Sequence, residues 1–312
     1  MAIASLSPVV AERIVRVHGQ RGATWLRTLP SLLAALETAW GLVEIGTPFA
    51  GARAGFVAPV RNGDGTTFVL KLLPNATWAS HEADALAHWA GRGAVALNRV
   101  DPARGALLIE RAVPGDDLIA LCYADDRGAT AAAASVMTEL RTAGDSSNMT
   151  LPDLTTWIDA LKPSRGAGSS GYAQACSRAR ALADDLLTDA KRMVIHGDLQ
   201  HYNIVNAQRA PWLAVDPKGV VGPREAEAAA LLRNPRHFVL SHPQPAALLS
   251  DRIDILAERL GDDSGRLLLW GYVLAVVAAA WALEDHDGEV DARGWLACAD
   301  LLWHLASARK VT

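Results

Sequence analysis

The chain has 312 residues, half of them hydrophobic, which is enough to bury a large core and to form two lobes or domains. Its formal net charge of −4 argues against the broad basic surface that binds nucleic acid. Three scattered cysteines, with no CxxC pair and no histidine at zinc spacing, argue against a disulfide framework or a structural zinc site.

The sequence also predicts a cytoplasmic protein. Glu12, Arg13 and Arg16 interrupt the apolar residues near the N-terminus, which therefore lacks the organisation of a signal peptide. The longest apolar run covers residues 267–283 and is marginal in length for a bilayer span. We interpret it as a buried helix, and we expect no membrane or nucleic-acid partner and a monomer or weak dimer.

The first part of the chain predicts a long helical segment followed by a small antiparallel sheet. Apolar residues recur at helical spacing over 8–40, where Gly19, Gly22 and Pro30 interrupt the run. Asn-Gly-Asp-Gly at 62–65 favours a hairpin turn because these residues tolerate positive φ. The remaining elements predicted here are strands over 42–49, 55–61, 66–73, 95–100 and 106–110 and a helix over 81–91. Their order is β-β-β-α-β-β.

Beyond residue 114 the apolar spacing is mostly helical. The predicted helices cover 117–124, 128–143, 153–161, 172–192, 223–233, 245–260, 264–284 and 289–308, with a loop over 163–171. The only strands expected here are 193–195, 204–206 and 213–215. The sequence therefore predicts an α+β fold of two lobes, with N-terminal helices and a sheet in residues 1–111 and a mainly helical lobe in residues 112–312.

The polar residues between these three short strands are the most informative in the chain. Residues 196–203 read His-Gly-Asp-Leu-Gln-His-Tyr-Asn, and Asp216 follows the next apolar strand. A kinase catalytic loop needs this order, because one carboxylate takes a hydroxyl proton while an amide and a second carboxylate hold magnesium on ATP. We therefore predict Asp198 as the base and Asn203 and Asp216 as the metal ligands.

A kinase also needs positive charge on the phosphates of its nucleotide. Lys71 has apolar neighbours on both sides of its strand, so we interpret it as the phosphate lysine rather than a lysine facing water. Glu82 opens the next predicted helix and is its expected partner, although the helix dipole alone also favours a glutamate there. Gly51 and Gly55 lie where a phosphate loop belongs, but they form no GxGxxG and equally fit a plain hairpin connection.

Two further residues, one in the loop and one in the turn after Asp216, have less specific roles. We expect His196 to brace the loop through hydrogen bonds, while Lys218 either faces the phosphates or lies in a turn. Gly197 precedes Asp198, where a protein kinase has arginine, and only a short segment separates Asp216 from the following helix. That segment leaves no platform for an extended peptide, which favours a small-molecule acceptor.

Three motifs resemble a known family. His-Gly-Asp-Leu-Gln-His-Tyr-Asn at 196–203, Asp-Pro-Lys-Gly at 216–219 and Leu-Leu-Arg-Asn-Pro at 231–235 are similar to those of the aminoglycoside/hydroxyurea phosphotransferases, whose best-known members are streptomycin 6-kinases. The resemblance implies a protein-kinase-like bilobal fold, ATP with Mg²⁺ and phosphorylation of a hydroxyl on a small molecule. It also implies that Glu110 and Arg111 form the hinge that touches adenine through its backbone.

Three residues depart from the family pattern. Gln200 stands where the family usually has a second histidine, Tyr202 where it has glycine, and Glu227 where such kinases often have aspartate. Tyr202 immediately precedes the predicted metal ligand Asn203, and we expect it to narrow the mouth of the substrate site. These changes bear on the substrate more than on the reaction.

A cationic acceptor such as streptomycin, which carries two guanidinium groups, needs carboxylates that accept bidentate hydrogen bonds. The candidates are Glu284 and Asp285 after the last long apolar run and Asp153 earlier in the chain. An acidic run after an apolar helix is equally typical of a solvated loop. Trp281 is a candidate stacking wall for a sugar or a guanidinium group.

The function predicted first is ATP- and Mg²⁺-dependent phosphorylation of an aminoglycoside such as streptomycin, at its 6-hydroxyl, with inactivation of the antibiotic. One alternative is a kinase on the same scaffold for an amino sugar, a choline-like alcohol or a peptide antibiotic. A second is a nucleotide-binding protein without turnover. The second alternative leaves unexplained why the lysine, the base and both metal ligands occur together.

Overall fold

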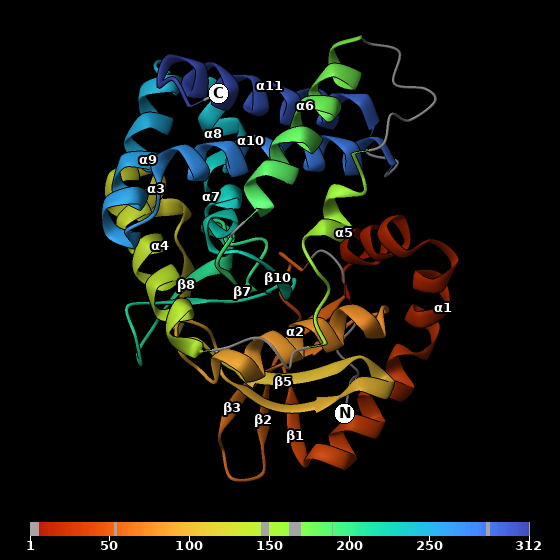
Figure 1. Cartoon of the computed structure of the whole chain (residues 1–312). Helices are drawn as coiled ribbons and strands as arrows, with labels where there is room; N and C mark the ends of the chain where they lie inside the picture. The colour runs from red at the N-terminus through yellow and green to blue at the C-terminus, as the bar shows by residue number, and fades with distance from the viewer. Residues whose placement is uncertain are drawn as a thin grey trace.

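The computed structural model describes residues 6–52, 55–144, 150–161, 170–188, 190–284 and 288–311. Its smaller lobe is a five-stranded antiparallel sheet in the order β1-β2-β3-β5-β4, with one helix across it (Figure 1). The elements are β1 (Leu42–Ile45), β2 (Phe56–Asn62), β3 (Thr67–Leu72), α2 (Ala76–Trp89), β4 (Leu97–Asp101), the 3₁₀ turn η1 (Pro102–Arg104) and β5 (Ala106–Glu110). The predicted order β-β-β-α-β-β is confirmed.

Helix α1 (Pro8–Trp40) packs on the sheet through its own small core. Val10, Ile14 and Leu36 of the helix are buried with Phe56 and Leu70 of the sheet. The helix is broken once, at Gly19, where φ is 56° and ψ is −136°, values that glycine adopts without steric cost. Of the three interruptions that the sequence suggested, only this one departs from helical geometry in the described part of the chain.

Helix α2 begins earlier than its sequence spacing predicts. The side chain of Asn75 caps its first turn and accepts hydrogen bonds from the backbone N–H groups of Thr77 at 3.1 Å and Trp78 at 3.4 Å. Because the helix starts at Ala76 instead of 81, Glu82 lies near its middle. The helix dipole therefore does not explain this glutamate. Its predicted pairing with Lys71 remains as the reason for its position.

The larger lobe is mainly helical and lies above the sheet in Figure 1. Its helices are α3 (Ile119–Ala124), α4 (Asp126–Leu140), α5 (Thr155–Ile158), α6 (Ser170–Leu187), α7 (Ala229–Arg233), α8 (Arg236–Ser241), α9 (Pro245–Leu260), α10 (Ser264–Glu284) and α11 (Gly288–Ala308). The 3₁₀ turns are η2 (Arg141–Ala143), η3 (His201–Asn203) and η4 (Arg224–Ala228). The predicted helices 245–260 and 264–284 are confirmed, whereas α8 was not predicted and most of the predicted loop 163–171 lies outside the described residues.

The larger lobe also contains five short strands, where the sequence predicted three. They are β6 (Pro114–Asp117), β7 (Arg192–Ile195), β8 (Ile204–Ala207), β9 (Trp212–Ala214) and β10 (Val220–Pro223). The two that were missed are strands only because of distant partners: β6 pairs with β8, and β10 pairs with β7. The expectation that the other three are the only strands of this lobe is therefore wrong.

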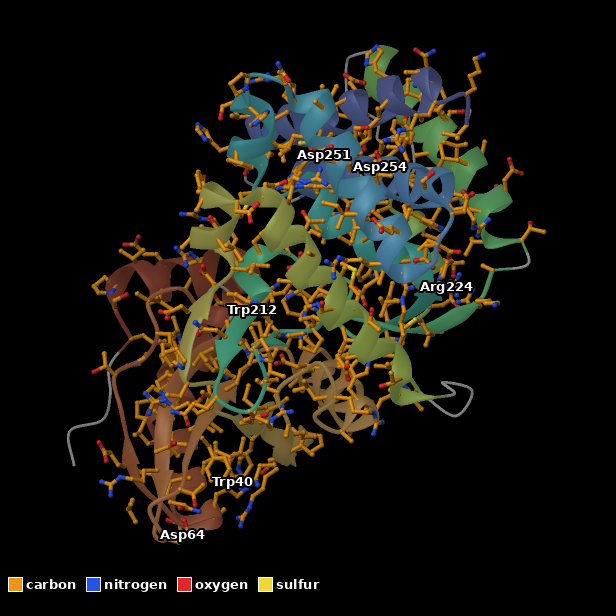
Figure 2. The ribbon with its side chains drawn as sticks, turned by 90° about the vertical axis from the view of Figure 1, so that its left-hand side faces the viewer. Trp40, Asp64, Trp212, Arg224, Asp251 and Asp254 are labelled. Atoms are coloured by element: carbon orange, nitrogen blue, oxygen red, sulfur yellow. The ribbon has the colours of Figure 1, made fainter. Side chains whose placement is uncertain are left out.

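The apolar run at 267–283 forms most of α10, a helix long and apolar enough to cross a membrane. However, 67% of its apolar window is buried inside the protein, as in the core helix of a soluble protein. Helix α10 packs against α6, α7 and α11 and anchors a core that continues through the catalytic-loop region into α2. Figure 2 shows the extent of the molecule, with Asp64 of the β2–β3 hairpin at one end and Asp251 and Asp254 of α9 toward the other.

Candidate active site

Two neighbouring segments of the larger lobe carry the predicted catalytic residues. One is the loop 196–203 between β7 and β8, and the other is the turn after β9. Backbone hydrogen bonds join them: Val215 N–H donates to Asn203 O at 2.9 Å, and Lys218 N–H donates to His196 O at 2.8 Å. The pairing of β7 with β10 and of β8 with β9 therefore holds the two segments side by side.

The predicted base and metal ligands lie together at this junction. The side-chain amide of Asn203 donates to the backbone oxygen of Asp198 at 2.8 Å and to its Oδ2 at 3.2 Å. Gln200 also donates to both carboxylate oxygens of Asp198, at 3.2 and 3.4 Å. Burial raises the pKa of Asp198, although the charges of Lys218 and Arg233 oppose this effect.

His196 and Glu227 fix the backbone of the loop. The carboxylate of Glu227 is buried and accepts hydrogen bonds from the N–H groups of His196 at 2.7 Å and Gly197 at 3.4 Å. The His196 ring accepts from the N–H of Asp198 at 3.2 Å and lies 2.9 Å from the backbone oxygen of Val215. Burial lowers the pKa of His196 to about 4, so a neutral ring braces the loop, as its sequence position suggested.

A buried ion-pair network extends from the smaller lobe to Asp216. Lys71 of β3 pairs with Glu82 of α2 at 2.6 Å and also with Asp216, and both Lys71 and Glu82 are buried. Lys218 donates to the second carboxylate oxygen of Asp216 at 3.0 Å. Although burial opposes ionisation of Asp216, the two ammonium groups outweigh it and hold the pKa of this carboxyl well below its usual range.

Asn203 and Asp216 fit a divalent metal. The amide nitrogen of Asn203 is committed to Asp198, which leaves the amide oxygen to serve as a ligand. The carboxylate of Asp216 is ionised, and 42% of its side chain is exposed. Amide and carboxylate oxygens are the donors that Mg²⁺ prefers in proteins.

The two glycines predicted to cradle phosphates have different surroundings. A Cβ atom at Gly55 would lie 2.2 Å from the backbone oxygen of Leu72, so glycine is needed there for two strands to approach. A Cβ atom at Gly51 would meet nothing within 4 Å. Residues 53 and 54 lie outside the described residues, so a phosphate-binding role for this segment stays a prediction.

Glu110 ties the two lobes together through its side chain. Its carboxylate accepts two hydrogen bonds of 2.8 Å from Arg209, in the β8–β9 hairpin, and one from the N–H of Ala96 at 2.8 Å. Its own N–H donates to Ala96 O at 2.8 Å. Arg111 is exposed. Contact of this hinge with adenine stays a prediction, and the N–H of Glu110 is already occupied.

The predicted acceptor residues are only partly brought to the catalytic loop. Asp153 is ion-paired with Arg192, and it also accepts from Thr155 N–H at 2.9 Å at the start of α5, so its carboxylate serves the fold. Trp281 lies with its ring centroid 5.2 Å from that of Trp157, which packs against the loop at Gly197.

Of the acidic candidates near the end of α10, only Glu284 lies among the described residues. Glu284 is exposed at the last residue of the helix. Asp285 lies outside the described residues. A role of either carboxylate in binding the acceptor therefore stays a prediction.

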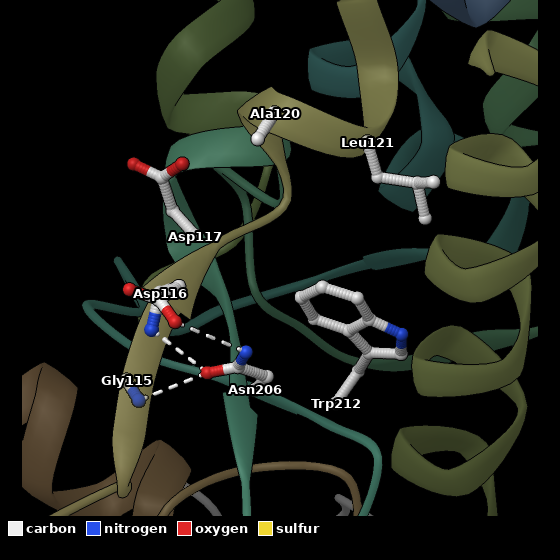
Figure 3. Close-up of a pocket in the computed structure, with 7 residues that line it drawn as sticks. All are labelled: Gly115, Asp116, Asp117, Ala120, Leu121, Asn206 and Trp212. Atoms are coloured by element: carbon white, nitrogen blue, oxygen red, sulfur yellow. Dashed lines mark hydrogen bonds between the residues drawn. The ribbon is translucent and has the colours of Figure 1, made fainter. Parts of the chain in front are cut away.

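A separate pocket of about 670 Å³ lies between β6, α3 and the β8–β9 hairpin (Figure 3). Its lining includes Asp116, Leu121 and Trp212. The side chain of Asn206 points into this region and accepts from the N–H groups of Gly115 at 2.9 Å and Asp116 at 2.8 Å (Figure 3). Its amide thus serves to join β6 to β8, and none of the predicted catalytic residues lines the pocket.

Sequence reasoning missed Arg233, the last residue of α7. Its side chain is buried and interacts electrostatically with Asp198. A signal was present, because the arginine ends the apolar run 229–232 and apolar runs are normally buried. Only the folded structure, in which Arg233 interacts electrostatically with Asp198, turns that signal into a site residue.

Comparison with known proteins agrees with this geometry. The chain is 28% identical to the streptomycin 6-kinase of Streptomyces glaucescens, over 90% of this chain and 92% of that protein. It is 30% identical to the hydroxyurea phosphotransferase of Kitasatospora aureofaciens, over 93% of this chain and 83% of that protein.

A solved structure shares the fold. Amicoumacin kinase in complex with AMP-PNP, Ca²⁺ and amicoumacin superposes with a TM-score of 0.62 at 12% identity, covering 92% of this chain and 97% of the kinase. The sequence profile described as aminoglycoside/hydroxyurea antibiotic resistance kinase matches residues 39–286, which is most of the chain. The fold is thus protein-kinase-like and bilobal, and the chain belongs to the aminoglycoside/hydroxyurea antibiotic resistance kinase family.

Proposed function

We propose that this phosphotransferase transfers the γ-phosphoryl group of ATP to a hydroxyl of streptomycin, most directly the 6-hydroxyl, in the cytoplasm. The observation that carries the proposal is the meeting of Asp198, Asn203 and Asp216 beside the Lys71–Glu82 ion pair. The relative with 28% identity over nearly its full length is a streptomycin 6-kinase, which supports this acceptor. Magnesium, when bound, would offset negative charge on the phosphates.

In this proposal the chain's own residues position charge and move one proton. Residues 1–111 bind the nucleotide, with Lys71 held by Glu82 so that its ammonium group faces the α- and β-phosphates. Asn203 and Asp216 would supply oxygens to Mg²⁺. Residues 112–312 bind the acceptor. Asp198 accepts the proton of its hydroxyl as the new oxygen–phosphorus bond forms and the bond from the γ-phosphorus to the bridging oxygen breaks, which releases ADP.

A second acceptor has its own support. The hydroxyurea phosphotransferase is 30% identical to this chain, so hydroxyurea belongs in the same test as streptomycin. Both compounds carry a hydroxyl, and the residues that contact the reacting phosphoryl group would be the same for each.

The test is release of ADP by the purified protein with Mg²⁺–ATP and a panel of acceptors. The panel contains streptomycin, other aminoglycosides, hydroxyurea, viomycin-like peptides, amino sugars and choline. Turnover with streptomycin supports the proposal, and mass spectrometry of the product locates the phosphate. Turnover only with an amino sugar or choline makes the protein a metabolic kinase. Nucleotide binding without turnover of any acceptor contradicts the proposal.

A further inference from the structure

Lys218 belongs to the turn that follows β9, and its backbone is fixed beside the catalytic loop. Its N–H group donates to the backbone oxygen of His196 at 2.8 Å. At the next residue, a Cβ atom on Gly219 would lie 2.4 Å from the backbone oxygen of His81 in α2, so this end of the turn lies against the smaller lobe. The side chain of Lys218 therefore starts from a fixed point where the two lobes meet.

The side chain itself lies at the junction of the two catalytic segments. A Cβ atom on Gly197, the residue directly before the base Asp198, would lie 3.4 Å from the Cβ atom of Lys218, in van der Waals contact. The Nζ atom of Lys218 donates to Oδ2 of Asp216 at 3.0 Å. The charge of Lys218 also interacts with that of Asp198. The ammonium group thus lies on the predicted metal ligand and on the side of the catalytic base.

Folding stability does not explain this ammonium group. The side chain of Lys218 is 46% exposed and that of Asp216 is 42% exposed. An ion pair between groups that solvent reaches so freely contributes little to stability. Among the described residues, Asp216 is the only hydrogen-bond partner of the ammonium group, which carries three donors. The group is therefore accessible, and it has donors left for a ligand.

Lys71 provides the contrast. Its side chain is only 7% exposed and pairs with the carboxylates of both Glu82 and Asp216, so its ammonium group is held from two sides. Lys71 binds Oδ1 of Asp216, whereas Lys218 binds Oδ2. The first lysine thus meets the carboxylate from the smaller lobe, and the second meets it beside the loop that carries the base. The acceptor hydroxyl and the phosphorus that it attacks must come together beside that base.

We propose that Lys218 is a catalytic residue whose ammonium group binds the γ-phosphoryl group of ATP during its transfer. The inference rests on the proposed function, because it takes ATP as the donor and Asp198 as the base. In the step, the acceptor oxygen bonds to the γ-phosphorus, its proton passes to Asp198, and the bond to the bridging oxygen breaks, so that ADP leaves. The phosphoryl oxygens are negatively charged throughout, and the flexible stem of Lys218 lets its ammonium group turn from Asp216 toward them.

The experiment compares Lys218→Met, Lys218→Arg and the matched control Lys191→Met with the unaltered protein. Lys191 is exposed and directly precedes β7, at the end of that strand away from the catalytic loop, so its replacement removes the same charge elsewhere. For each protein we would measure the thermal unfolding midpoint and the affinities for Mg²⁺–ADP and for Mg²⁺–AMP-PNP, an ATP analogue that keeps a γ-phosphoryl group. We would also measure kcat with the acceptor that the panel identifies.

The two nucleotides separate contact with the γ-phosphoryl group from every other effect. Lys218→Met should bind Mg²⁺–ADP within about twofold of the unaltered protein, but it should bind Mg²⁺–AMP-PNP about tenfold more weakly, because one charge-assisted hydrogen bond is lost. Its kcat should fall about 100-fold or more, since the contact strengthens in the transition state. Lys218→Arg keeps the charge and should recover part of both losses. Lys191→Met should match the unaltered protein within about twofold.

An equal loss of affinity for both nucleotides would overturn the inference, because Lys218 would then hold Asp216, the other phosphates or the fold. A lower unfolding midpoint in Lys218→Met alone would identify the last of these. Unchanged kcat and unchanged affinity for Mg²⁺–AMP-PNP in Lys218→Met would also overturn it. Failure of the proposed function looks different, since the unaltered protein would then turn over no acceptor. The comparison of the two nucleotides needs no acceptor and would still test Lys218.

Discussion

Asp198 and Asp216 are two carboxylates in one site with different electrostatic surroundings. Burial raises the pKa of Asp198, which favours uptake of a proton during the reaction. Lys71 and Lys218 outweigh burial at Asp216 and keep that carboxylate ionised, as a metal ligand must be. The difference assigns proton transfer to the first residue and metal binding to the second.

Replacing each aspartate should therefore produce a different defect. Asp198→Ala should lower turnover by about 10²–10⁴-fold while nucleotide affinity changes by only a few fold, because only proton transfer and acceptor orientation are lost. Asp216→Ala should instead remove the dependence of nucleotide affinity on Mg²⁺. Steady-state kinetics and calorimetric titrations with and without Mg²⁺ measure both effects. Retained turnover in the first variant, or unchanged metal dependence in the second, contradicts the assignment.

Glu227 supports the loop, and its contribution to the free energy of unfolding depends on pH. Burial raises its pKa to about 7, despite the hydrogen bonds from His196 and Gly197, whereas its ordinary value is 4.5. Below the ordinary value the carboxyl is protonated in both the folded and unfolded states. Between that value and pH 7 only the unfolded state releases the proton, so the contribution of Glu227 to folding stability falls as the pH rises.

The variant Glu227→Gln tests this linkage. A neutral amide has no such titration, so the difference in unfolding free energy, variant minus unaltered protein, should increase by roughly 3 kcal/mol from pH 4.5 to above 7. Urea unfolding at a series of pH values measures the difference. Parallel pH profiles for the two proteins would show that the carboxyl does not titrate in this range. The absolute stability of the variant also reflects one lost hydrogen bond, which makes the slope the decisive quantity.

At the scale of elements, the two glycines in the connection between β1 and β2 differ in how much space surrounds them. Gly55 lies where two strands approach, and an added methyl group would collide with backbone that cannot move aside. Gly55→Ala should therefore lower the unfolding free energy by about 1–3 kcal/mol, as overpacking commonly does. Gly51→Ala is the control and should change it by less than about 0.5 kcal/mol, as surface substitutions do. Equal effects in chemical denaturation would contradict this distinction.

The elements that the sequence predicted correctly are those with a local signal. The helices 245–260 and 264–284 carry clear apolar spacing, and the strand 106–110 is a short apolar run. The strands β6 and β10 lack such a signal, because they depend on pairing with strands far along the chain. The start of α2 was misplaced because a single capping residue, Asn75, extends the helix beyond its apolar pattern.

The same distinction applies to the site. The loop 196–203 and Asp216 could be identified from sequence because their order and spacing are fixed by the chemistry of phosphoryl transfer. The place of Arg233 in the site could not, since neither the apolar run before it nor the motif 231–235 shows that folding lets it interact with Asp198. Asp153 looked like a free carboxylate until folding paired it with Arg192. Acceptor residues are hard to predict in general, because they come from separate helices whose side chains meet only in three dimensions.

At the scale of the whole molecule, α2 belongs to one core that extends through both lobes. Leu86 and Trp89 of this helix share one continuous apolar core with Leu199 of the catalytic loop and Val273 of α10. The oxygen of His81 approaches Gly219 so closely that an added Cβ there would lie 2.4 Å away. The smaller lobe therefore cannot lose its structure without exposing part of the core of the larger one.

This shared core predicts that the protein unfolds in one cooperative transition and that nucleotide stabilises both lobes together. At a nucleotide concentration 100 times the dissociation constant, Mg²⁺–ATP should add about 2.7 kcal/mol to the unfolding free energy and raise the single midpoint. ATP with a chelator should raise it much less, and Asp216→Ala should show the same small shift with or without Mg²⁺. Scanning calorimetry makes the measurement. Two separate transitions, of which only one moves with nucleotide, would mean that α2 does not couple the lobes.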